Sequence, residues 1–487
     1  MKPNSLLLIS VLPGSHRHLS CLTLFAIAKA HGVDTWLLFI PDRATCDEAL
    51  FAEFLQSHAF SVIGFSVTTG DFQFCRSLTA AIRRCQPQAH VVWGGIHPTS
   101  LPEECLPFVD SLCIGESERT LPALLDHISL NQESTSLPGI AWKNAEGKVI
   151  LNPPPPVVSD LDSLPINHYD FERFFVMDDR GLHRFGLDDY RRYSKHHGED
   201  YTLMTSRSCP YNCSYCINSY LNKLNRSNGR IRRRSVDHVL QEIAQARAQI
   251  PSLRFINFID DIFLTSKAWT REFCRKYGEQ VGLPFIVRTV PSTITDTEIA
   301  ELKRVGLAVV QTGIQSGSAR THEQIFHRHF DRDAILRSAQ VLHRHRVKGM
   351  YDFIIENDFE LDADRDLTIE LILDLPKPFE INLFALTVFP RTDLERMYHD
   401  AGLRPRIDPY QSDYLDYNEA DFHYQLASII PSTPNQVCRE IFRHRTAANR
   451  TLLNDLYQDC RPRLRNVAST IKTLPVYPRE ERELQPA

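Results

Sequence analysis

Residues 205–219 read TSRSCPYNCSYCINS and place three thiols, Cys209, Cys213 and Cys216, in a C-x3-C-x2-C pattern. The apolar run YTLMTS, residues 201–206, precedes them directly and predicts a buried strand that ends where the thiols begin. An iron-sulfur cluster normally takes four thiolates, so three leave one iron open to a further ligand. We therefore predict a [4Fe-4S] cluster with a catalytic position on these three residues.

A structural zinc ion is the competing interpretation, because zinc sites with three Cys and one His are common. Such a site needs its fourth ligand nearby, and after Cys216 the first His or Cys is His238. The strand that precedes the thiols also argues against a chance pattern. Zinc is therefore the second choice for this loop.

The strand before the thiols opens a series of six alternating strand and helix signals. The apolar runs cover residues 201–206, 255–263, 284–290, 308–318, 348–355 and 381–390. Helix-length stretches separate them at residues 237–250, 270–280, 296–306, 334–347 and 363–375. This alternation predicts a parallel, partial (β/α)6 barrel over residues 201–403, with functional groups at the carboxyl ends of its strands.

Residues 1–135 show a second rhythm of the same kind. Short apolar runs at residues 6–11, 35–40, 60–67, 90–95 and 111–115 lack the polar alternation of a half-exposed sheet. They predict an α/β domain with a doubly wound, flavodoxin-like parallel sheet, in which ligands bind beyond the carboxyl ends of the strands. The candidate ligand loops are residues 13–20, 66–70, 94–99 and 115–118.

Two segments fit neither rhythm. Residues 136–200 contain a hairpin signal around Glu146 and Gly147 and four successive prolines at 153–156, and we interpret them as a linker. Residues 404–487 are rich in Tyr, Arg and His. We expect this C-terminal segment to be mostly helical, from about residue 435 to 473, and to shape the substrate pocket.

The composition points to a small-molecule partner. A formal charge of −5 over 487 residues gives no basic field, so no nucleic-acid binding is expected. No apolar run reaches the ~18 residues of a membrane span and no signal peptide is visible, so we expect a soluble, cytoplasmic protein without an integral membrane segment. Twelve Cys in this setting favour reduced thiols, and the nine outside the triplet are expected to be structural.

The cysteine pattern resembles the signature of the radical S-adenosylmethionine (SAM) enzymes, in which an aromatic residue, here Tyr215, precedes the last Cys. The wider resemblance, over residues 1–400, is to the cobalamin-binding, methyltransferase-type branch of that family. Its habitual phrases stand in order: VVWGGIHPTSLPEECL (91–106), IGESERTL (114–121), DLDSLPINHYD (160–170), FINFIDDIF (255–263), TGIQSGS (312–318) and VFPRTDLERM (388–397).

The resemblance implies that SAM chelates the open iron and is cleaved reductively to a 5′-deoxyadenosyl radical. The candidate SAM contacts by position are Tyr215, Asp260, Asp261, Arg288, Gln315, Ser316 and Ser318. Of these, Asp260 or Asp261 would meet the ammonium group and Arg288 the carboxylate, and residues 315–318 would meet the ribose or methionyl part. The structural alternatives are a helix N-cap for the Asp pair and a surface ion pair for Arg288.

The resemblance also implies that the N-terminal domain binds cobalamin. The candidate contacts on its ligand loops are Ser15, Ser66, Thr68, Thr69, Gly94, Gly95, Gly115 and Glu116. The pattern D-x-H-x-x-G is absent, so we expect no His as lower cobalt ligand and a loop-structuring role for His97. A flavodoxin-like sheet that has lost its ligand is the alternative.

Departures from the family pattern lie at strand ends and indicate an unusual substrate or a diverged member. Glu356 and Asn357 replace a usual glycine and its neighbour, Gln315 replaces a frequent Glu, and Arg391 replaces a frequent Gly.

Together these features predict an enzyme: a cobalamin-dependent radical SAM methyltransferase that methylates an unactivated carbon, or as second choice phosphorus, of a small biosynthetic intermediate. It would need a low-potential electron donor such as flavodoxin or ferredoxin. An oxidative cyclase or rearrangement enzyme with the same cofactors is the first alternative. A non-enzymatic cobalamin or metal sensor is the second.

Overall fold

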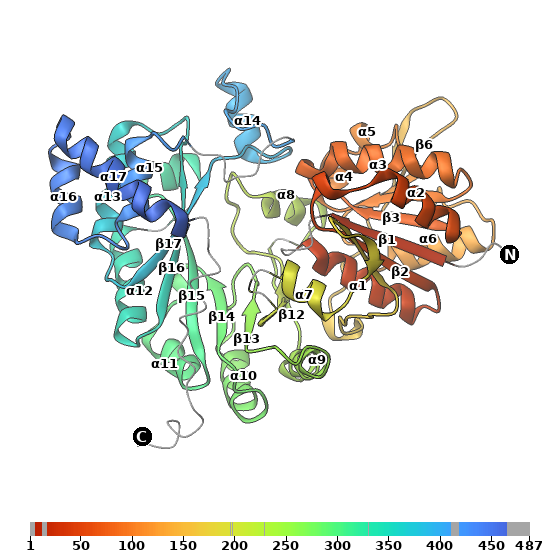
Figure 1. Ribbon diagram of the computed structural model, residues 1–487, viewed down its shortest axis with the longest axis horizontal. Coiled ribbons are helices and arrows are strands. Elements are labelled where there is room, and N and C mark those ends of the chain that lie inside the picture. Colours follow the sequence, from red (N-terminus) through yellow and green to blue (C-terminus); the bar gives the residue numbers. More distant parts are fainter. Residues whose placement is uncertain are drawn as a thin grey trace.

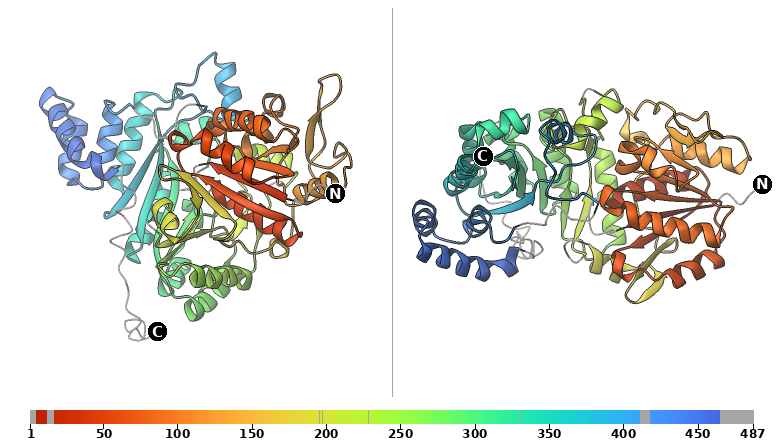
Figure 2. Two further views of the ribbon diagram at one scale, coloured as in Figure 1. Left: turned by 45° about the vertical axis from the view of Figure 1, so that its right-hand side comes forward. Right: turned by 90° about the horizontal axis from the view of Figure 1, so that it is seen from above.

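The computed structural model describes residues 5–11, 17–194, 196, 198–227, 229–329, 331–410 and 418–464. Two sheets organise the chain and lie side by side, with the cysteine loop and α8 (Ile217–Leu224) between them (Figures 1 and 2). The first sheet belongs to the N-terminal half and the second to the C-terminal half.

The predicted doubly wound sheet is confirmed. Its parallel centre has the order β5-β4-β3-β1-β2, with strands β1 (Ser5–Val11), β2 (Asp34–Ile40), β3 (Val62–Ser66), β4 (His90–Gly94) and β5 (Ser111–Cys113). Alternate residues of β1 enter opposite cores: Leu6 and Leu8 pack with α1 (Arg17–Ala30) and α6 (Thr120–Ser129), whereas Leu7 and Ile9 pack with α2 (Glu48–Ser57) and α3 (Phe72–Cys85). Both faces are therefore covered, as the continuous apolar runs require.

Residues 136–200, expected to be a linker, instead complete this sheet at both edges. The predicted hairpin forms β6 (Ile140–Lys143) and β7 (Val149–Leu151), which pair antiparallel beside β5. At the other edge β8 (Phe174–Asp178) pairs with β2, and β9 (Gly181–Arg184) follows it. A sheet edge exposes unpaired backbone groups, and these added strands cover both edges of the parallel core.

The predicted partial barrel is also confirmed. Its parallel strands follow chain order: β10 (Asp200–Leu203), β13 (Phe255–Phe258), β14 (Phe285–Thr289), β15 (Leu307–Gln315), β16 (Lys348–Ile355) and β17 (Phe379–Ala385). The connecting helices are α9 (Val236–Gln249), α10 (Lys267–Gln280), α11 (Asp296–Arg304), α12 (Arg332–Arg344) and α13 (Asp362–Asp374). Because β10 and β17 end the sheet, the barrel is open on one side.

The C-terminal segment divides into two parts. After α14 (Asp393–Asp400) the chain returns to the N-terminal half, where the Tyr410 hydroxyl donates a hydrogen bond of 2.8 Å to Glu104 of α5 (Pro102–Cys105). Helices α15 (Phe422–Ile429) and α16 (Asn435–Arg443) pack against α13 on the outside of the barrel, and α17 (Ala447–Leu464) packs against α15 and α16 (Figure 1). The expectation that this segment shapes the substrate pocket stays a prediction, and residues 465–473 of the predicted helix lie outside the described residues.

Among the described helices, not one is long and apolar enough to cross a membrane.

Candidate functional site

The three cysteines occupy the loop that leaves the first barrel strand. A short antiparallel pair, β11 (Ser206–Arg207) and β12 (Arg232–Arg233), supports the start of this loop. Cys216 lies at the N-cap of α8, and its backbone N–H donates to the Cys213 carbonyl at 3.1 Å. The loop is thus a compact turn held between a strand pair and a helix.

One glycine contact shows how tightly this loop is enclosed. Gly229 has φ of +71°, and a Cβ there would lie 2.8 Å from Pro210 Cα and 2.9 Å from the Cys209 carbonyl oxygen. Backbone atoms cannot move away cheaply, so only glycine fits behind the first cysteine.

The thiols of this loop lie in a desolvated environment. Burial raises the pKa of Cys209 and of Cys216 to about 12, and the charges of the neighbouring cysteines add to both shifts. The three groups are therefore electrostatic neighbours. Because a metal binds the thiolate, metal binding here must release protons.

The three sulfur atoms are not preset at the spacing of ligands to a single metal ion. Among the described residues, Cys209, Cys213 and Cys216 do not form a group whose ligand atoms all lie within 4.8 Å of one another. In a zinc site, Zn–S bonds of about 2.3 Å would hold any two of the sulfur atoms within about 4.6 Å of each other. The donor set fits three ligands of a larger iron-sulfur core.

Among the described residues, one group has the spacing of ligands to a single metal ion: Asp178, His183 and Asp189. Arg180 lies among them, with its Nη2 2.5 Å from Asp178 Oδ2 and in contact with Asp189. Arg180 balances one of the two negative charges, and Arg192 Nη1 lies 4.0 Å from Asp178 Oδ2. The group is therefore best described as an ion cluster of the first unit.

The Asp pair after β13 divides into a buried and an exposed carboxylate. Asp260 is fully buried and accepts hydrogen bonds from Thr205 N (3.1 Å), Thr205 Oγ1 (2.7 Å) and the Ser206 hydroxyl. Asp261 is exposed and accepts one from Asn218 Nδ2 at 3.0 Å. Asp260 thus holds Thr205 and Ser206, the residues that lead into the cysteine loop, whereas the Asp261 carboxylate remains accessible to a ligand. The alternative N-cap role is wrong, since Ser266 caps α10.

Arg288 belongs to a polar ladder across the barrel strands. Its Nε donates to Gln311 Oε1 at 3.1 Å, and the Gln311 amide donates to Asp352 at 2.8 and 3.0 Å. Asn382 donates to the same carboxylate at 2.7 Å. The four residues come from β14, β15, β16 and β17, so Arg288 lies within the barrel rather than in a surface ion pair.

The last residue of β15 and the residues that follow it also divide by exposure. The hydroxyls of Ser316 and Ser318 are buried, and they donate to Glu360 (2.9 Å) and Asp364 (2.5 Å) beside α13. Gln315 is partly exposed and has φ of +76°, at a register shift between β15 and β16. The two serines therefore anchor the loop, and Gln315 is the more accessible candidate.

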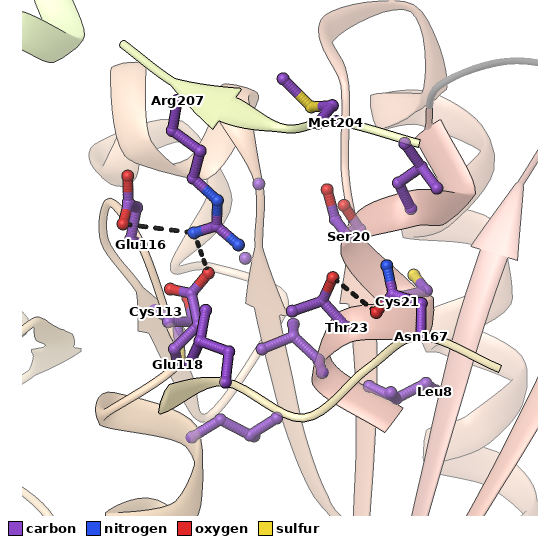
Figure 3. A pocket seen from close by; sticks show the side chains of 18 of the residues that line it. Leu8, Ser20, Cys21, Thr23, Cys113, Glu116, Glu118, Asn167, Met204 and Arg207 are labelled. Carbon is purple, nitrogen blue, oxygen red and sulfur yellow. Dashed lines mark hydrogen bonds and ion pairs between the residues drawn. The ribbon is translucent and has the colours of Figure 1, made fainter. Parts of the chain in front are cut away.

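A cavity of about 340 Å³ lies where the first sheet meets the cysteine loop (Figure 3). Residues of four strands of the first sheet line it: Leu8 of β1, Gly64, Phe65 and Ser66 of β3, Val92 and Gly94 of β4, and Cys113 of β5. Gly64, Gly94 and the following Gly95 have no side chain to cover their backbone. Met204, Ser206 and Arg207 close it from the barrel side. Both halves of the molecule thus contribute walls to one cavity.

The predicted cobalamin contacts fall into three groups. Ser66, Gly94, Gly95, Gly115 and Glu116 line the cavity. Thr68 and Thr69 do not; the Thr68 hydroxyl instead donates to Asp71 at 2.5 Å. Ser15 lies outside the described residues.

His97 packs away from this cavity. It is fully buried between the rings of Phe72 and Tyr410, with centroids 4.7 and 5.6 Å away. Burial lowers its pKa to about 4, so the ring is neutral near pH 7. This position supports a structural role in its loop.

Several cavity residues escaped the sequence interpretation. Arg207 reaches from β11 to Glu116 (3.3 Å) and to Glu118, and on the opposite wall Thr23 donates to Asn167 at 3.1 Å (Figure 3). Arg207 and Asn167 stand in motifs that the sequence does display, SRSC and DLDSLPINHYD. Proximity to the first cysteine was the available signal for Arg207.

The two halves match two known families. Residues 6–125 match the B12 binding domain, and residues 203–372 match the Radical SAM superfamily. The chain belongs to the cobalamin-binding radical SAM family. Cobalamin, SAM and a [4Fe-4S] cluster are the cofactors that these two domains imply, and the cavity and the thiol loop are the places whose chemistry fits them.

Curated relatives of this radical SAM protein match it over part of their length. An uncharacterized methyltransferase, PH0819, of Pyrococcus horikoshii is 27% identical over 54% of this chain and 53% of its own. The anaerobic magnesium-protoporphyrin IX monomethyl ester cyclase of Synechocystis sp. is 26% identical over 63% of this chain and 57% of its own. The chain therefore spans little more than half the length of these relatives.

A solved structure has the same fold over nearly the whole chain. The radical SAM methyltransferase TsrM of Kitasatospora setae, solved with cobalamin and a [4Fe-4S] cluster, aligns with a TM-score of 0.67. The alignment covers 94% of this chain and 99% of TsrM at 14% identity. At 14% identity, this structural similarity shows that the two proteins share a fold and the arrangement of its two domains.

Proposed function

We propose that this chain is a cobalamin-dependent radical SAM methyltransferase that acts on an unactivated carbon, or as second choice phosphorus, of a small molecule. The observation that carries the proposal is that residues 204–207 border both the cavity and the cysteine loop. Met204, Ser206 and Arg207 wall the cavity of the B12 domain, and the first cysteine follows Arg207 by two positions. A radical centre and a methyl carrier must lie close together, and this strand borders both sites.

The bound groups supply the radical and methyl-transfer chemistry, and the chain supplies binding and orientation. Cys209, Cys213 and Cys216 would hold the cluster. Asp261, exposed beside α8, would accept the SAM ammonium group, and Gln315 would meet the ribose or methionyl part. Asp260 would fix the loop from behind through Thr205 and Ser206.

Ser66, Gly94, Gly95, Gly115 and Glu116 would contact cobalamin, because they line the cavity between the domains. Gly94 and Gly95 leave room for a ligand that presses against backbone. His97, neutral and packed between aromatic rings away from the cavity, would not contact cobalamin.

The test begins with protein purified without oxygen and loaded with iron, sulfide and cobalamin. With SAM and a low-potential reductant, we expect 5′-deoxyadenosine from reductive cleavage and S-adenosylhomocysteine from methyl transfer to cobalamin. The variant with Cys209, Cys213 and Cys216 all changed to Ala should lose iron and 5′-deoxyadenosine while it retains cobalamin. One zinc per chain and no corrin would overturn the proposal.

A cyclase that uses the same cofactors is the second candidate, supported by the Synechocystis relative. Methyl transfer consumes SAM in two ways and yields both products, whereas a cyclase yields 5′-deoxyadenosine without S-adenosylhomocysteine. The ratio of the two products therefore separates the candidates. A ligand sensor would produce neither.

The electron donor is proposed by class. Reductive cleavage needs one electron at low potential, and a flavodoxin or ferredoxin would supply it. Reduction of the loaded protein by each donor, followed by the absorbance of the cluster, tests this assignment without a known substrate.

A further inference from the structure

The segment after β15 is bonded directly to the cysteine loop. Ser214 N donates to the Phe326 carbonyl at 3.1 Å, and Ser214 Oγ donates to the Ile325 carbonyl at 2.5 Å. The rings of Tyr215 and Phe326 pack edge to face with centroids 4.9 Å apart. Residues 325–328, in IFHRHF, therefore form one wall behind the second and third cysteines.

Arg328 extends from this wall to a cluster ligand. It is buried, with only 6% of its surface exposed. Its Nη1 lies 3.9 Å from Cys213 Sγ and donates to the Tyr215 hydroxyl at 2.7 Å, and its Nη2 donates to the Gly313 carbonyl at 2.8 Å. The guanidinium thus holds three groups at once, one of which is a cluster sulfur.

The charge of Arg328 is retained in this position. An arginine side chain stays protonated in proteins, even where it is as buried as Arg328. A cation inside a protein interacts with nearby charges far more strongly than one in water.

We propose that Arg328 is a positioning residue that raises the reduction potential of the cluster held by Cys209, Cys213 and Cys216. This inference rests on the cluster assigned above. In the reduction, one electron passes from a low-potential donor, which is oxidised, to the cluster, which gains one negative charge. A fixed cation and a hydrogen bond at a ligand sulfur both stabilise the more negative form.

The geometry also explains why arginine, rather than lysine, suits this site. A planar guanidinium can donate toward Cys213, Tyr215 and Gly313 in fixed directions, whereas an ammonium is a compact point charge on a flexible stem. Lysine would keep the charge and lose part of the hydrogen-bond pattern. Glutamine would lose the charge.

The experiment is a potentiometric titration of the cluster, followed by electron paramagnetic resonance, without SAM or cobalamin. At the midpoint potential of the unchanged protein, Arg328→Gln should lower the ratio of reduced to oxidised cluster about tenfold, or about 59 mV for one electron. Arg328→Lys should lower it less than Arg328→Gln. Arg332→Gln, which removes a charge from α12 beside Asp374, should leave it unchanged.

The signal comes only from molecules that hold a cluster, so partial loading does not hide the result. If Arg328→Gln holds no cluster, Arg328→Lys should hold one with a ratio within about threefold of the unchanged protein. A cluster-bearing Arg328→Gln with an unchanged potential, or a tenfold loss in Arg328→Lys, would overturn the inference. Absence of any cluster in the unchanged protein would instead contradict the proposed function.

Discussion

Arg232 donates a hydrogen bond of 2.9 Å from its Nη1 to Oε2 of Glu116, and its Nη2 bonds the other carboxylate oxygen. Arg232 lies on the strand that pairs with the start of the cysteine loop, and Glu116 lies on the loop after β5 that lines the cavity. This forked ion pair is 8% exposed on the Arg side and 22% on the Glu side. It therefore joins the two cofactor regions through a mostly desolvated contact.

Glu116→Gln is expected to loosen this junction. The change leaves Arg232 and Arg207 without the carboxylate charge they share, at a cost of about 1–3 kcal/mol in the free energy of unfolding. Urea denaturation measures the loss. Glu146→Gln, on the exposed hairpin turn, is the matched control and should change stability by less than about 0.5 kcal/mol. Equal urea midpoints for Glu116→Gln and Glu146→Gln would contradict the stabilising role of the ion pair between Arg232 and Glu116.

Alanine substitutions at the adjacent residues Gly94 and Gly95 test whether cobalamin binds in the cavity. Gly95 has φ of +96° and ψ of −169°, and a Cβ there would lie 2.8 Å from the Val67 carbonyl oxygen. Gly95→Ala should therefore cost about 3 kcal/mol or more, from strain and from the clash. At Gly94 the nearest atom would be Cys113 Cβ at an ordinary 3.5 Å, so stability should change by less than about 1 kcal/mol.

The same pair separates folding from binding. Because Gly94 lines the cavity, Gly94→Ala places a methyl group where the ligand would press against backbone. We expect this variant to keep the thermal midpoint of the unchanged protein but to retain less cobalamin after gel filtration, as read from corrin absorbance. Full retention of cobalamin would argue that the ligand lies elsewhere.

Asp260 and Asp261 are adjacent, yet their substitution should affect different properties: stability for Asp260 and SAM affinity for Asp261. Asp260→Asn replaces an acceptor of three hydrogen bonds with a group that also donates, inside the core, and should cost about 2–3 kcal/mol and reduce iron retention. Asp261→Asn is exposed and should leave stability unchanged within about 0.5 kcal/mol. SAM affinity, measured by calorimetry on loaded protein, should fall about tenfold in Asp261→Asn. An unchanged affinity would remove Asp261 from the SAM site.

The strands and helices of both units could be predicted because their apolar runs are long and bounded by clear breaks. Of the edge strands, only β6 and β7 were revealed, by their hairpin turn. Strand β8 is as long as β3, but it lies in a segment of charged and aromatic residues outside the strand and helix alternation. Side-chain direction was the harder problem. Ser316 and Ser318 share a motif with Gln315, but their hydroxyls bond Glu360 and Asp364, more than 40 positions away. Such partners are fixed by tertiary packing, which spacing within a motif does not encode.

Glu360 gives stability a pH dependence of predictable sign. It accepts hydrogen bonds from Ser316 Oγ (2.9 Å) and Thr321 Oγ1 (2.8 Å), and burial raises its pKa from 4.5 to about 7. Between these two values the folded protein binds more protons than the unfolded chain, so the contribution of Glu360 to stability falls as pH rises from about 4.5 to 7.

Glu360→Gln removes this penalty, because the amide is neutral at every pH and its carbonyl oxygen still accepts a hydrogen bond. The thermal midpoint of Glu360→Gln, relative to the unchanged protein, should therefore be higher at pH 8 than at pH 5. A pKa difference of this size corresponds to at most about 3 kcal/mol, and solvent near this partly buried carboxyl reduces it. Asp358→Asn, on the exposed side of the same loop, controls for a general charge effect, although it also alters the bond from Tyr398. If the difference in midpoint stayed constant across this pH range, Glu360 would titrate as an ordinary carboxyl and the loop behind Ser316 would be open to water.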